Sequence, residues 1–428
     1  MPDADRPPTL AEAQASPSSD VRPPFRLRSL GLSVYVPTFL FAVGQGAIIP
    51  TIPQFADSLG ASVAMAAMIV GLRGVGTMLF DIPAGVLVGK FGDRYAMVIG
   101  TFALAVVAIG ASFSRSPLVF AVLVFVMGCA WSIWLLARLS YVTEQAPVEV
   151  RGRALSLLGG ANRIGNFVGP ILGGYIALAV GLEYVFWLQA GMAVAASAMM
   201  FMLLSPSEDA REIHDSSIYS RVATVVVDHR RTFVTAGSAV ICLQVMRNAR
   251  QVVVPLWGLQ VGLDAAQIGL VMGLSSGIDM LLFYPVGSVM DRFGRKWVGV
   301  PSLVVLAISM ALIPVSNSFT TLMLVGLVAG LGNGLGAGIV MTLGADFSPA
   351  RGRGEFLGVW RLIGDIGTAG GPFVVGGLAA VLSLGAASVA TGGVGLLGAA
   401  IMYLFVAEPL RRRTPVEPLA RAEGGAAR

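Results

Sequence analysis

Residues 287–296 read Gly-Ser-Val-Met-Asp-Arg-Phe-Gly-Arg-Lys, and residues 85–94 read Gly-Val-Leu-Val-Gly-Lys-Phe-Gly-Asp-Arg. The two segments lie 202 residues apart, each between long apolar runs. Both keep two glycines and a phenylalanine, whereas the acid Asp291 of the later segment is replaced by Gly89 in the earlier one. A short charged segment that recurs between apolar runs indicates a chain built from two related halves.

The same offset relates much of the remaining chain without gaps. It aligns Pro53 with Pro255, Gly71 with Gly273, Pro83 with Pro285, Arg151-Gly152 with Arg353-Gly354, and Gly169-Pro170 with Gly371-Pro372. Glycine and proline matches carry the most weight because they mark backbone constraints. A six-helix unit duplicated in parallel is typical of a secondary transporter whose site lies between its halves.

The composition is that of a membrane protein. Of the 428 residues, 55% are hydrophobic and only 12% are charged, about half the charged share of a soluble domain. This excludes most soluble enzymes, disordered scaffolds and nucleic-acid binders. Both cysteines lie in apolar runs, the two histidines have no ligand partners nearby, and no Walker A sequence occurs. We therefore expect no enzymatic activity, cofactor, metal site or use of ATP.

The apolar runs predict an all-α protein with twelve transmembrane helices in two pseudo-symmetric six-helix bundles. A membrane helix needs about 20 apolar residues. The predicted spans are 33–57, 62–89, 96–114, 118–143, 154–179, 184–204, 233–257, 266–290, 298–315, 320–343, 355–380 and 385–407. The predicted domains are a disordered tail at 1–30, a bundle at 31–204, a central loop at 205–232, a second bundle at 233–407 and a tail at 408–428.

The basic residues predict the orientation. With the N-terminus inside the cell, the predicted outside loops hold only Arg115. The inside segments hold Arg22, Arg26, Arg28, Lys90, Arg94, Arg151, Arg153, Arg221, Arg230, Arg231, Arg292, Arg295, Lys296, Arg351, Arg353 and Arg411 to Arg413. This bias favours cytoplasmic tails and a cytoplasmic central loop. Only two lysines occur against 27 arginines, and this preference, with abundant Ala, Gly and Val, is typical of a GC-rich bacterial genome and so favours a bacterial plasma (inner) membrane.

The segment at 287–296 resembles the loop signature G-x-x-x-D-R-x-G-R-K of the major facilitator superfamily, in which it joins helices 2 and 3 and recurs between helices 8 and 9. The motif residues here are Gly85, Gly92, Gly287, Asp291, Arg292, Gly294 and Arg295. The resemblance implies that Asp291 faces the start of helix 5, near Gly152 to Ala154, and that Arg295 pairs with Asp346. Alternatively, these charges only fix the topology.

A second segment, Gly165-Asn-Phe-Val-Gly169-Pro170-Ile-Leu-Gly173-Gly174, resembles the helix 5 motif G-x-x-x-G-P-x-x-G-G of the superfamily's antiporters, notably its drug exporters. Small residues at every fourth position let helices pack closely. The motif thus implies antiport, and close packing without a transport role is the alternative. The tenth span adds a glycine ridge at Gly326, Gly330, Gly334 and Gly338, which we interpret as packing.

Ionisable residues inside the spans are candidate functional groups. A rise of about 1.5 Å per residue puts Asp81 and Arg361 at similar depth, and Arg163 and Asp279 near the midplane. The family fold places helix 2 beside helix 11 and helix 5 beside helix 8, so Asp81–Arg361 and Arg163–Asp279 are candidate pairs across the halves. Arg361 and Asp365 can also pair within one helix. Asp279 and Asp365 are the candidates for proton coupling, followed by Asp81.

In this family, helices 1, 4, 7 and 10 line the cavity. The resemblance therefore implies a substrate cavity that includes Thr38, Gln45, Trp131, Trp134, Arg138, Gln244, Arg247, Asn248 and Gln251. The arginines and amides suit an anionic or zwitterionic substrate, whereas the aromatic residues suit a hydrophobic one. The sequence does not decide between these two classes of substrate.

Together these features predict a monomeric transporter that exports hydrophobic or amphiphilic, drug-like small molecules by proton antiport and alternating access. The alternative is proton-coupled uptake or exchange of an organic anion or metabolite. The expected partners are a small-molecule substrate, protons and the lipid bilayer, without nucleic acid.

Overall fold

The computed structural model describes residues 31–204 and 218–408, which are helical almost throughout. The predicted tail at 1–30, the predicted tail at 408–428 except its first residue, and the loop segment 205–217 lie outside the described residues. Ten of the described helices are long and apolar enough to cross a membrane. One of these, α2, holds two crossings, and α7, whose polar residues lower its hydropathy, provides a further one. The described chain thus has the twelve crossings predicted from sequence.

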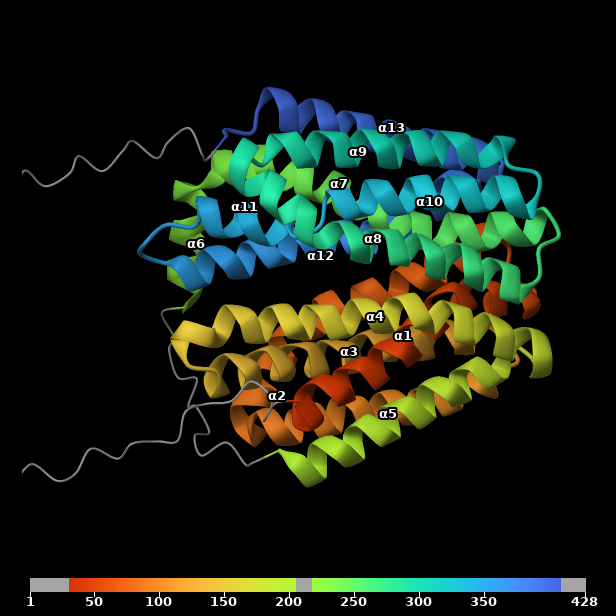
Figure 1. Cartoon of the computed structure of the whole chain (residues 1–428), viewed down its shortest axis with the longest axis horizontal. Helices are drawn as coiled ribbons and strands as arrows, with labels where there is room; N and C mark the ends of the chain where they lie inside the picture. Colours follow the sequence, from red (N-terminus) through yellow and green to blue (C-terminus); the bar gives the residue numbers. More distant parts are fainter. Residues whose placement is uncertain (1–30, 205–217, 409–428) are drawn as a thin grey trace, which may run out of the picture.

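The helices form two bundles side by side, one from each half of the chain (Figure 1). The first contains η1 (Gly31–Tyr35), α1 (Val36–Ser58), α2 (Val63–Ser112), α3 (Pro117–Gln145), α4 (Val148–Val180) and α5 (Glu183–Leu203). The second contains α7 (Arg230–Gln260), α8 (Ala265–Phe293), α9 (Lys296–Leu312), η2 (Ile313–Val315), α10 (Phe319–Leu335), α11 (Ile339–Phe347), α12 (Arg353–Ala379) and α13 (Leu384–Leu404).

The two loop segments lie at one end of the bundles, which we call the motif end. There Gly92 divides α2 into its two crossings with φ 75° and ψ 160°, and Gly294 ends α8 with φ 111°. A positive φ is open to glycine at no steric cost. The turns that contain Gly60, Gly181 and Gly262 lie at the other end, the opposite end.

Several helices begin at the opposite end with side-chain caps. Asp264 accepts a hydrogen bond from the backbone of Gln267, whose side chain in turn accepts from the backbone of Asp264. Ser318 and Thr321 make the same reciprocal arrangement at the start of α10. Each cap satisfies backbone N–H groups that have no partner inside the helix, so these polar residues fix where the crossings begin.

The tenth crossing is not the single helix predicted at 320–343. It breaks between Leu335 and Ile339, and Gly338 adopts φ 79°, the left-handed conformation. The predicted glycine ridge explains why. Gly326, Gly330 and Gly334 pack against α8, near Val271, Ser275 and Asp279, whereas a Cβ on Gly338 would meet only Met290 at 4.0 Å. Gly338 therefore allows the helix to break and does not pack against α8.

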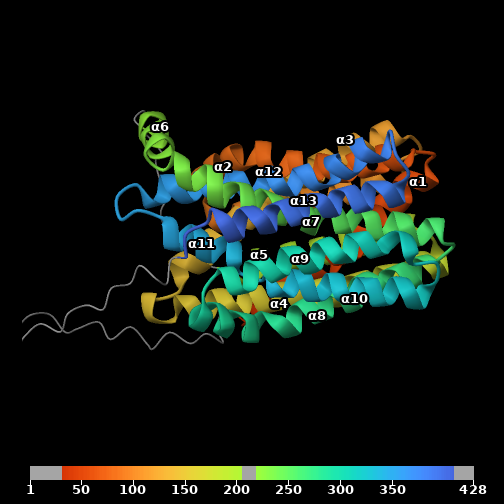
Figure 2. The same cartoon turned by 90° about the horizontal axis from the view of Figure 1, so that it is seen from above.

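The predicted central loop at 205–232 is also partly wrong, because its second part is helical. The short helix α6 (Ile218–Asp228) runs into α7 at Arg230 and stands across the direction of the bundle at the motif end (Figure 2). Arg221 pairs with Glu355 of α12 at 3.0 Å, and Val225 is buried against Gly352. These contacts anchor the helix to the second half.

The halves meet along two helix pairs, α4 with α8 and α2 with α12. Towards the opposite end these pairs touch through glycines. A Cβ added to Gly174 would lie 2.6 Å from the carbonyl oxygen of Ala265, and one on Gly74 would lie 2.7 Å from the Cα of Ala369. Such distances leave no room for a larger side chain, so the two halves are in close contact there.

Towards the motif end the same helices part. Gly85 lies one helical turn beyond Asp81, Gly159 one turn beyond Arg163, and Gly354 two turns beyond Arg361. A Cβ added to any of these glycines would meet no atom within 4 Å. The structure is therefore closed at the opposite end and open at the motif end.

Candidate functional site

An ion pair joins the halves at the level where α4 and α8 begin to part. Nη1 of Arg163 donates to Oδ2 of Asp279 over 2.8 Å. The guanidinium also lies over the ring of Phe283, 4.2 Å from its centroid. Both charged side chains are mostly buried. The structure thus brings together the two residues that the sequence predicts as a pair from their similar depth, their opposite charge and the helix neighbours that the family resemblance implies.

The second pair of helices carries a larger charged cluster. Arg361 of α12 lies 3.2 Å from Asp81 of α2 and 3.6 Å from Asp365, one turn away on its own helix. Asp81 also accepts a hydrogen bond from Ser132 of α3, whereas Oδ2 of Asp365 is buried and accepts none. The two arrangements that the sequence leaves open for Arg361 therefore occur together, and two carboxylates share one guanidinium.

A cavity of about 120 Å³ lies between the halves beside the Arg163–Asp279 pair. It is lined by α1, α4, α7, α8 and α10, through Gly46, Ile49, Arg163, Asn166, Pro170, Arg250, Gln251, Met272, Ser276, Asp279 and Asn333. Most of the side chains that carry charge or an amide belong to α4, α7 and α8. Gln251 is one of the predicted cavity residues. Asn166 and Asn333 were missed, although Asn166 lies within the antiporter-like motif and Asn333 directly precedes Gly334 of the glycine ridge.

The predicted polar side chains of α7 mostly form hydrogen bonds within the protein, some to other helices and some along α7 itself. Arg247 donates to the carbonyl oxygen of Gly336 over 2.6 Å and to Oε1 of Gln244 over 3.2 Å. Gln244 in turn donates to Thr368 of α12, and Asn248 donates to the backbone of Gln244. Gly336 lies in the break between α10 and α11, and its carbonyl oxygen also accepts a hydrogen bond from the backbone N–H of Ile339. Arg247 therefore stabilises the break.

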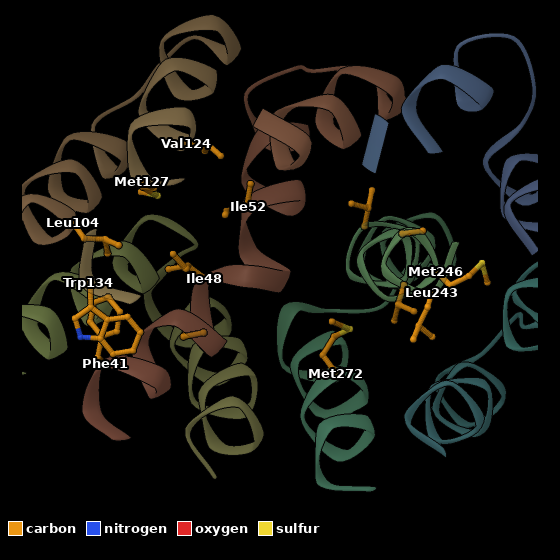
Figure 3. Packing of buried hydrophobic residues seen from close by; sticks show 14 of the residues in the cluster. Phe41, Ile48, Ile52, Leu104, Val124, Met127, Trp134, Leu243, Met246 and Met272 are labelled. Carbon is orange, nitrogen blue, oxygen red and sulfur yellow. The ribbon is translucent and has the colours of Figure 1, made fainter. Parts of the chain in front are cut away.

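Aromatic rings fill the space between α1 and α3. Phe41 of α1 packs on Trp134 and Trp131 of α3, with ring centroids 4.2 and 5.8 Å apart, and Figure 3 shows Phe41 against Trp134. Trp134 is fully buried, whereas Trp131 is half-buried. Arg138 lies over Trp134, with its Cζ 3.9 Å from the ring centroid. The predicted aromatic stripe is thus part of the core of the first half with one edge accessible.

The predicted residues of α1 are also buried. Thr38 and Gln45 are almost fully covered, and Gln45 accepts a hydrogen bond from Arg73 of α2. Arg73 lies in turn over Trp131, 5.4 Å from the ring centroid. Arg73 and Phe41 were not assigned to a site from sequence. An intramembrane arginine is a usable signal, but a phenylalanine in an apolar helix gives none.

The loop motif of the second half is assembled around Arg295. Its Nε donates to Asp346 over 2.7 Å, as the resemblance implies, and its Nη1 lies 3.6 Å from Asp291. Glu408, which sequence reasoning missed, accepts hydrogen bonds from the backbone N–H groups of Arg295 and Lys296. A carboxylate at a helix N-terminus is favourable, so Glu408 ties the end of α13 to the start of α9. Arg292 stacks over Phe293.

Asp291 does not face the start of helix 5 in this conformation, contrary to the prediction. Its side chain is 78% exposed. A Cβ on Gly152 would meet no atom within 4 Å, and the same holds for Gly85 and Gly287. The halves are separated at the motif end, so the first turn of α4 is out of reach.

The glycines of the antiporter-like motif are packing positions. Cβ atoms on Gly165, Gly169 and Gly173 would lie 2.5, 2.3 and 2.8 Å from α1, whereas one on Gly174 would approach α8. Pro170 lines the cavity. The motif therefore places α4 directly against α1 and against the other half.

Metal ligands do not gather in the part of the chain that the structure describes. No group of three or more His, Cys, Asp or Glu side chains that could hold a metal ion occurs among residues 31–204 and 218–408.

Comparison with known proteins gives the family. The model of the Major Facilitator Superfamily matches residues 34–245 and 236–426. An uncharacterized MFS-type transporter of Methanocaldococcus jannaschii is 23% identical over 354 residues, which are 82% of this chain and 91% of that protein. The multidrug resistance protein MdtG of Salmonella schwarzengrund is 28% identical over 167 residues, 38% of this chain and 41% of that protein.

Solved structures show the same fold. A mutant of the nucleoside transporter NupG superposes with a TM-score of 0.74 at 14% identity, covering 89% of this chain and all of that one. The inward-open xylose transporter XylE from E. coli gives 0.68 at 17% identity, covering 90% and 97%.

Proposed function

Because the chain belongs to the Major Facilitator Superfamily, and is therefore a multi-pass membrane transporter and not an enzyme, we propose that it exports hydrophobic or amphiphilic small molecules by proton antiport. The observation that carries this proposal is the cluster of Asp81, Arg361 and Asp365 across the two halves. The partial match to MdtG supports a substrate of the drug type.

The cluster offers a way to couple a proton to movement. Two carboxylates against one guanidinium leave one negative charge in a mostly buried site, which binding of a proton removes. Asp365 is the proposed carrier because its Oδ2 accepts no hydrogen bond, whereas Asp81 is held by Ser132. Protonated Asp365 no longer competes for Arg361, so Arg361 binds Asp81 and holds the halves together. Deprotonation draws Arg361 back towards its own helix.

Asp279 is the second candidate for the proton. It faces Arg163 one to one across the cavity, so its charge is already balanced in this conformation. We assign the Arg163–Asp279 pair chiefly to holding α4 and α8 at the level of the cavity. Opening of the opposite end requires these helices to separate and the pair to break.

We assign the motif end to the cytoplasm of a bacterial cell, with both termini inside. The excess of Arg and Lys at this end supports the assignment. The conformation described above is then open to the cytoplasm, ready to take up an export substrate. We further propose that the transporter acts as a monomer, since each half completes the site of the other.

The alternative, proton-coupled uptake or exchange of an organic anion or metabolite, is favoured by Arg163 and Arg250 in the cavity lining. Arg247, the other residue that suggested it, is bound to the helix break. A growth-inhibition and accumulation panel of toxic dyes and antibiotics, with and without the gene, separates the two. Export predicts better growth and lower accumulation with the gene. Higher accumulation with the gene would favour uptake and contradict export.

A further inference from the structure

Positive charge exceeds negative charge in the middle of the two bundles. Six arginines and three aspartates lie well inside the helical crossings, namely Arg73, Arg138, Arg163, Arg247, Arg250, Arg361, Asp81, Asp279 and Asp365. The three aspartates engage two of the arginines, Arg163 and Arg361. A buried charge without a counter-charge is unfavourable, so the remaining arginines need other partners.

Three of these four arginines have polar partners within the protein. Arg73 donates to Gln45, Arg247 to the carbonyl oxygen of Gly336, and Arg250 to Ser275. Arg138 differs from them. It is 8% exposed, and its Nε and Nη1 are buried without a hydrogen-bond partner. Its guanidinium lies over the indole of Trp134, which offsets part of the charge but accepts no conventional hydrogen bond.

The surroundings of Arg138 combine charge with aromatic surface. Trp131 and Trp134 lie 5.0 Å apart, with Arg138 beside Trp134 and Arg73 beside Trp131. Trp131 is half-buried, so the indole surface is not sealed. Arg138 also lies six residues beyond Ser132 on α3, about 9 Å further towards the motif end. Since Ser132 binds Asp81, Arg138 lies on the side where the halves have parted.

We propose that Arg138 binds the anionic group of the transported molecule, whose flat apolar body lies against Trp131. This inference rests on the proposed function and specifies its substrate class as aromatic or polycyclic organic anions. It joins the two preferences that conflict in the sequence, because one molecule satisfies both an arginine and an indole. An oxyanion supplies the hydrogen-bond acceptors that the two free nitrogen atoms of Arg138 lack.

Binding of a matched pair of probes to the purified full-length protein tests the proposal. The probes are 2-naphthoate and its uncharged analogue 2-naphthamide, followed by quenching of tryptophan fluorescence and by the Tm in detergent, without a proton gradient. We expect the wild type to bind naphthoate at least tenfold more tightly than naphthamide. Equal affinity for the two probes in the wild type would overturn the proposal.

Substitutions in the proposed site show which residues give the preference for naphthoate. Arg138→Met should remove the preference for naphthoate while leaving the Tm of the ligand-free protein unchanged or higher, because an unpaired buried charge is lost. Trp131→Leu should weaken both probes alike. Arg115→Gln, an exposed arginine in the loop before α3, is the control and should bind like the wild type. If Arg138→Met does not fold, Arg138→Gln replaces it.

Two results would contradict the assignment of Arg138. One is a naphthoate preference that survives in the Arg138 variant, and the other is a lower Tm of the ligand-free variant together with unchanged probe binding, as expected for a structural brace. Because binding is measured without a gradient, failure of proton-coupled export leaves this test intact. Likewise, loss of the naphthoate preference says nothing against proton antiport.

Discussion

The guanidinium of Arg163 on α4 lies 2.8 Å from the carboxylate of Asp279 on α8, at the level where the two halves change from close contact to separation. On one side of this pair, Phe167 and Gly277 of the same helices touch. On the other side, Gly159 faces open space. The pair therefore marks the inner limit of the opening.

The first prediction concerns this pair. Arg163→Gln and Asp279→Asn should each lower stability by about 1–3 kcal/mol, because each leaves a mostly buried charged group without its hydrogen-bond partner. The double variant should recover thermal stability and protein yield relative to either single variant, since no unpaired charge remains. Tm and membrane yield of the four proteins measure this. A double variant no more stable than the worse single variant would argue against the pairing.

The second prediction uses two glycines of the same helix. In Gly169→Ala the new Cβ would lie 2.3 Å from the carbonyl oxygen of Val43, and such overpacking destabilises by about 1–3 kcal/mol. Gly160→Ala meets nothing within 4 Å, and alanine in a helix is favoured over glycine by about 0.5–1 kcal/mol. The Tm should therefore fall in the first variant and stay level or rise in the second. The opposite order would mean that α4 is not packed on α1 as described.

The third prediction concerns the break in the tenth crossing. Gly338 has φ 79° with space around it, so Gly338→Ala should destabilise through its backbone alone, by about 1–2 kcal/mol. Asparagine tolerates this conformation better, so Gly338→Asn should lie nearer the wild type in Tm. Arg247→Gln should also lower the Tm, because the carbonyl of Gly336 keeps only the backbone N–H of Ile339 as a donor and loses the guanidinium. Equal Tm values for the alanine variant and the wild type would show that the break is not maintained.

Much of this architecture follows from the sequence. The 202-residue repeat and the apolar runs predict twelve crossings. The depths of Arg163, Asp279, Asp81 and Arg361, together with the helix neighbours that the family resemblance implies, predict which charges meet. These predictions succeed because a charged side chain inside a membrane is costly unless it faces a partner of opposite charge or a water-filled cavity. The break at Gly338 and the helix α6 were missed. The pattern of apolar residues does not reveal a single residue in the left-handed conformation, nor a short helix within a polar segment.

The candidate site was less predictable for a related reason. Whether Arg247 or Arg138 faces substrate depends on which backbone carbonyls and side chains lie nearby, and these come from distant parts of the chain. The predicted contact of Asp291 with the start of α4 is absent from the structure. A transporter sequence encodes every conformation of its cycle, whereas the structure describes one of them.

The fourth prediction therefore concerns the other state. If the motif end closes during transport, Asp291 should approach the start of α4. Cysteines at Asp291 and Gly152, in a background without Cys129 and Cys242, should cross-link readily only when the protein is trapped closed at the motif end. Asp291→Asn should slow transport while leaving the Tm of the open form unchanged. Rapid transport by that variant, with no cross-link in any state, would refute the contact.

The final prediction addresses the proposed exchange of protons for substrate. Energised inverted membrane vesicles, which expose the cytoplasmic face of the membrane to the medium and have an acidic lumen, receive a compound identified by the accumulation panel while lumenal and external pH are recorded. We expect the wild type to release protons into the medium as the compound enters the lumen. Asp365→Asn should equilibrate the compound without releasing protons. Transport by the wild type with no proton release, or proton release by Asp365→Asn equal to that of the wild type, would contradict the proposed exchange.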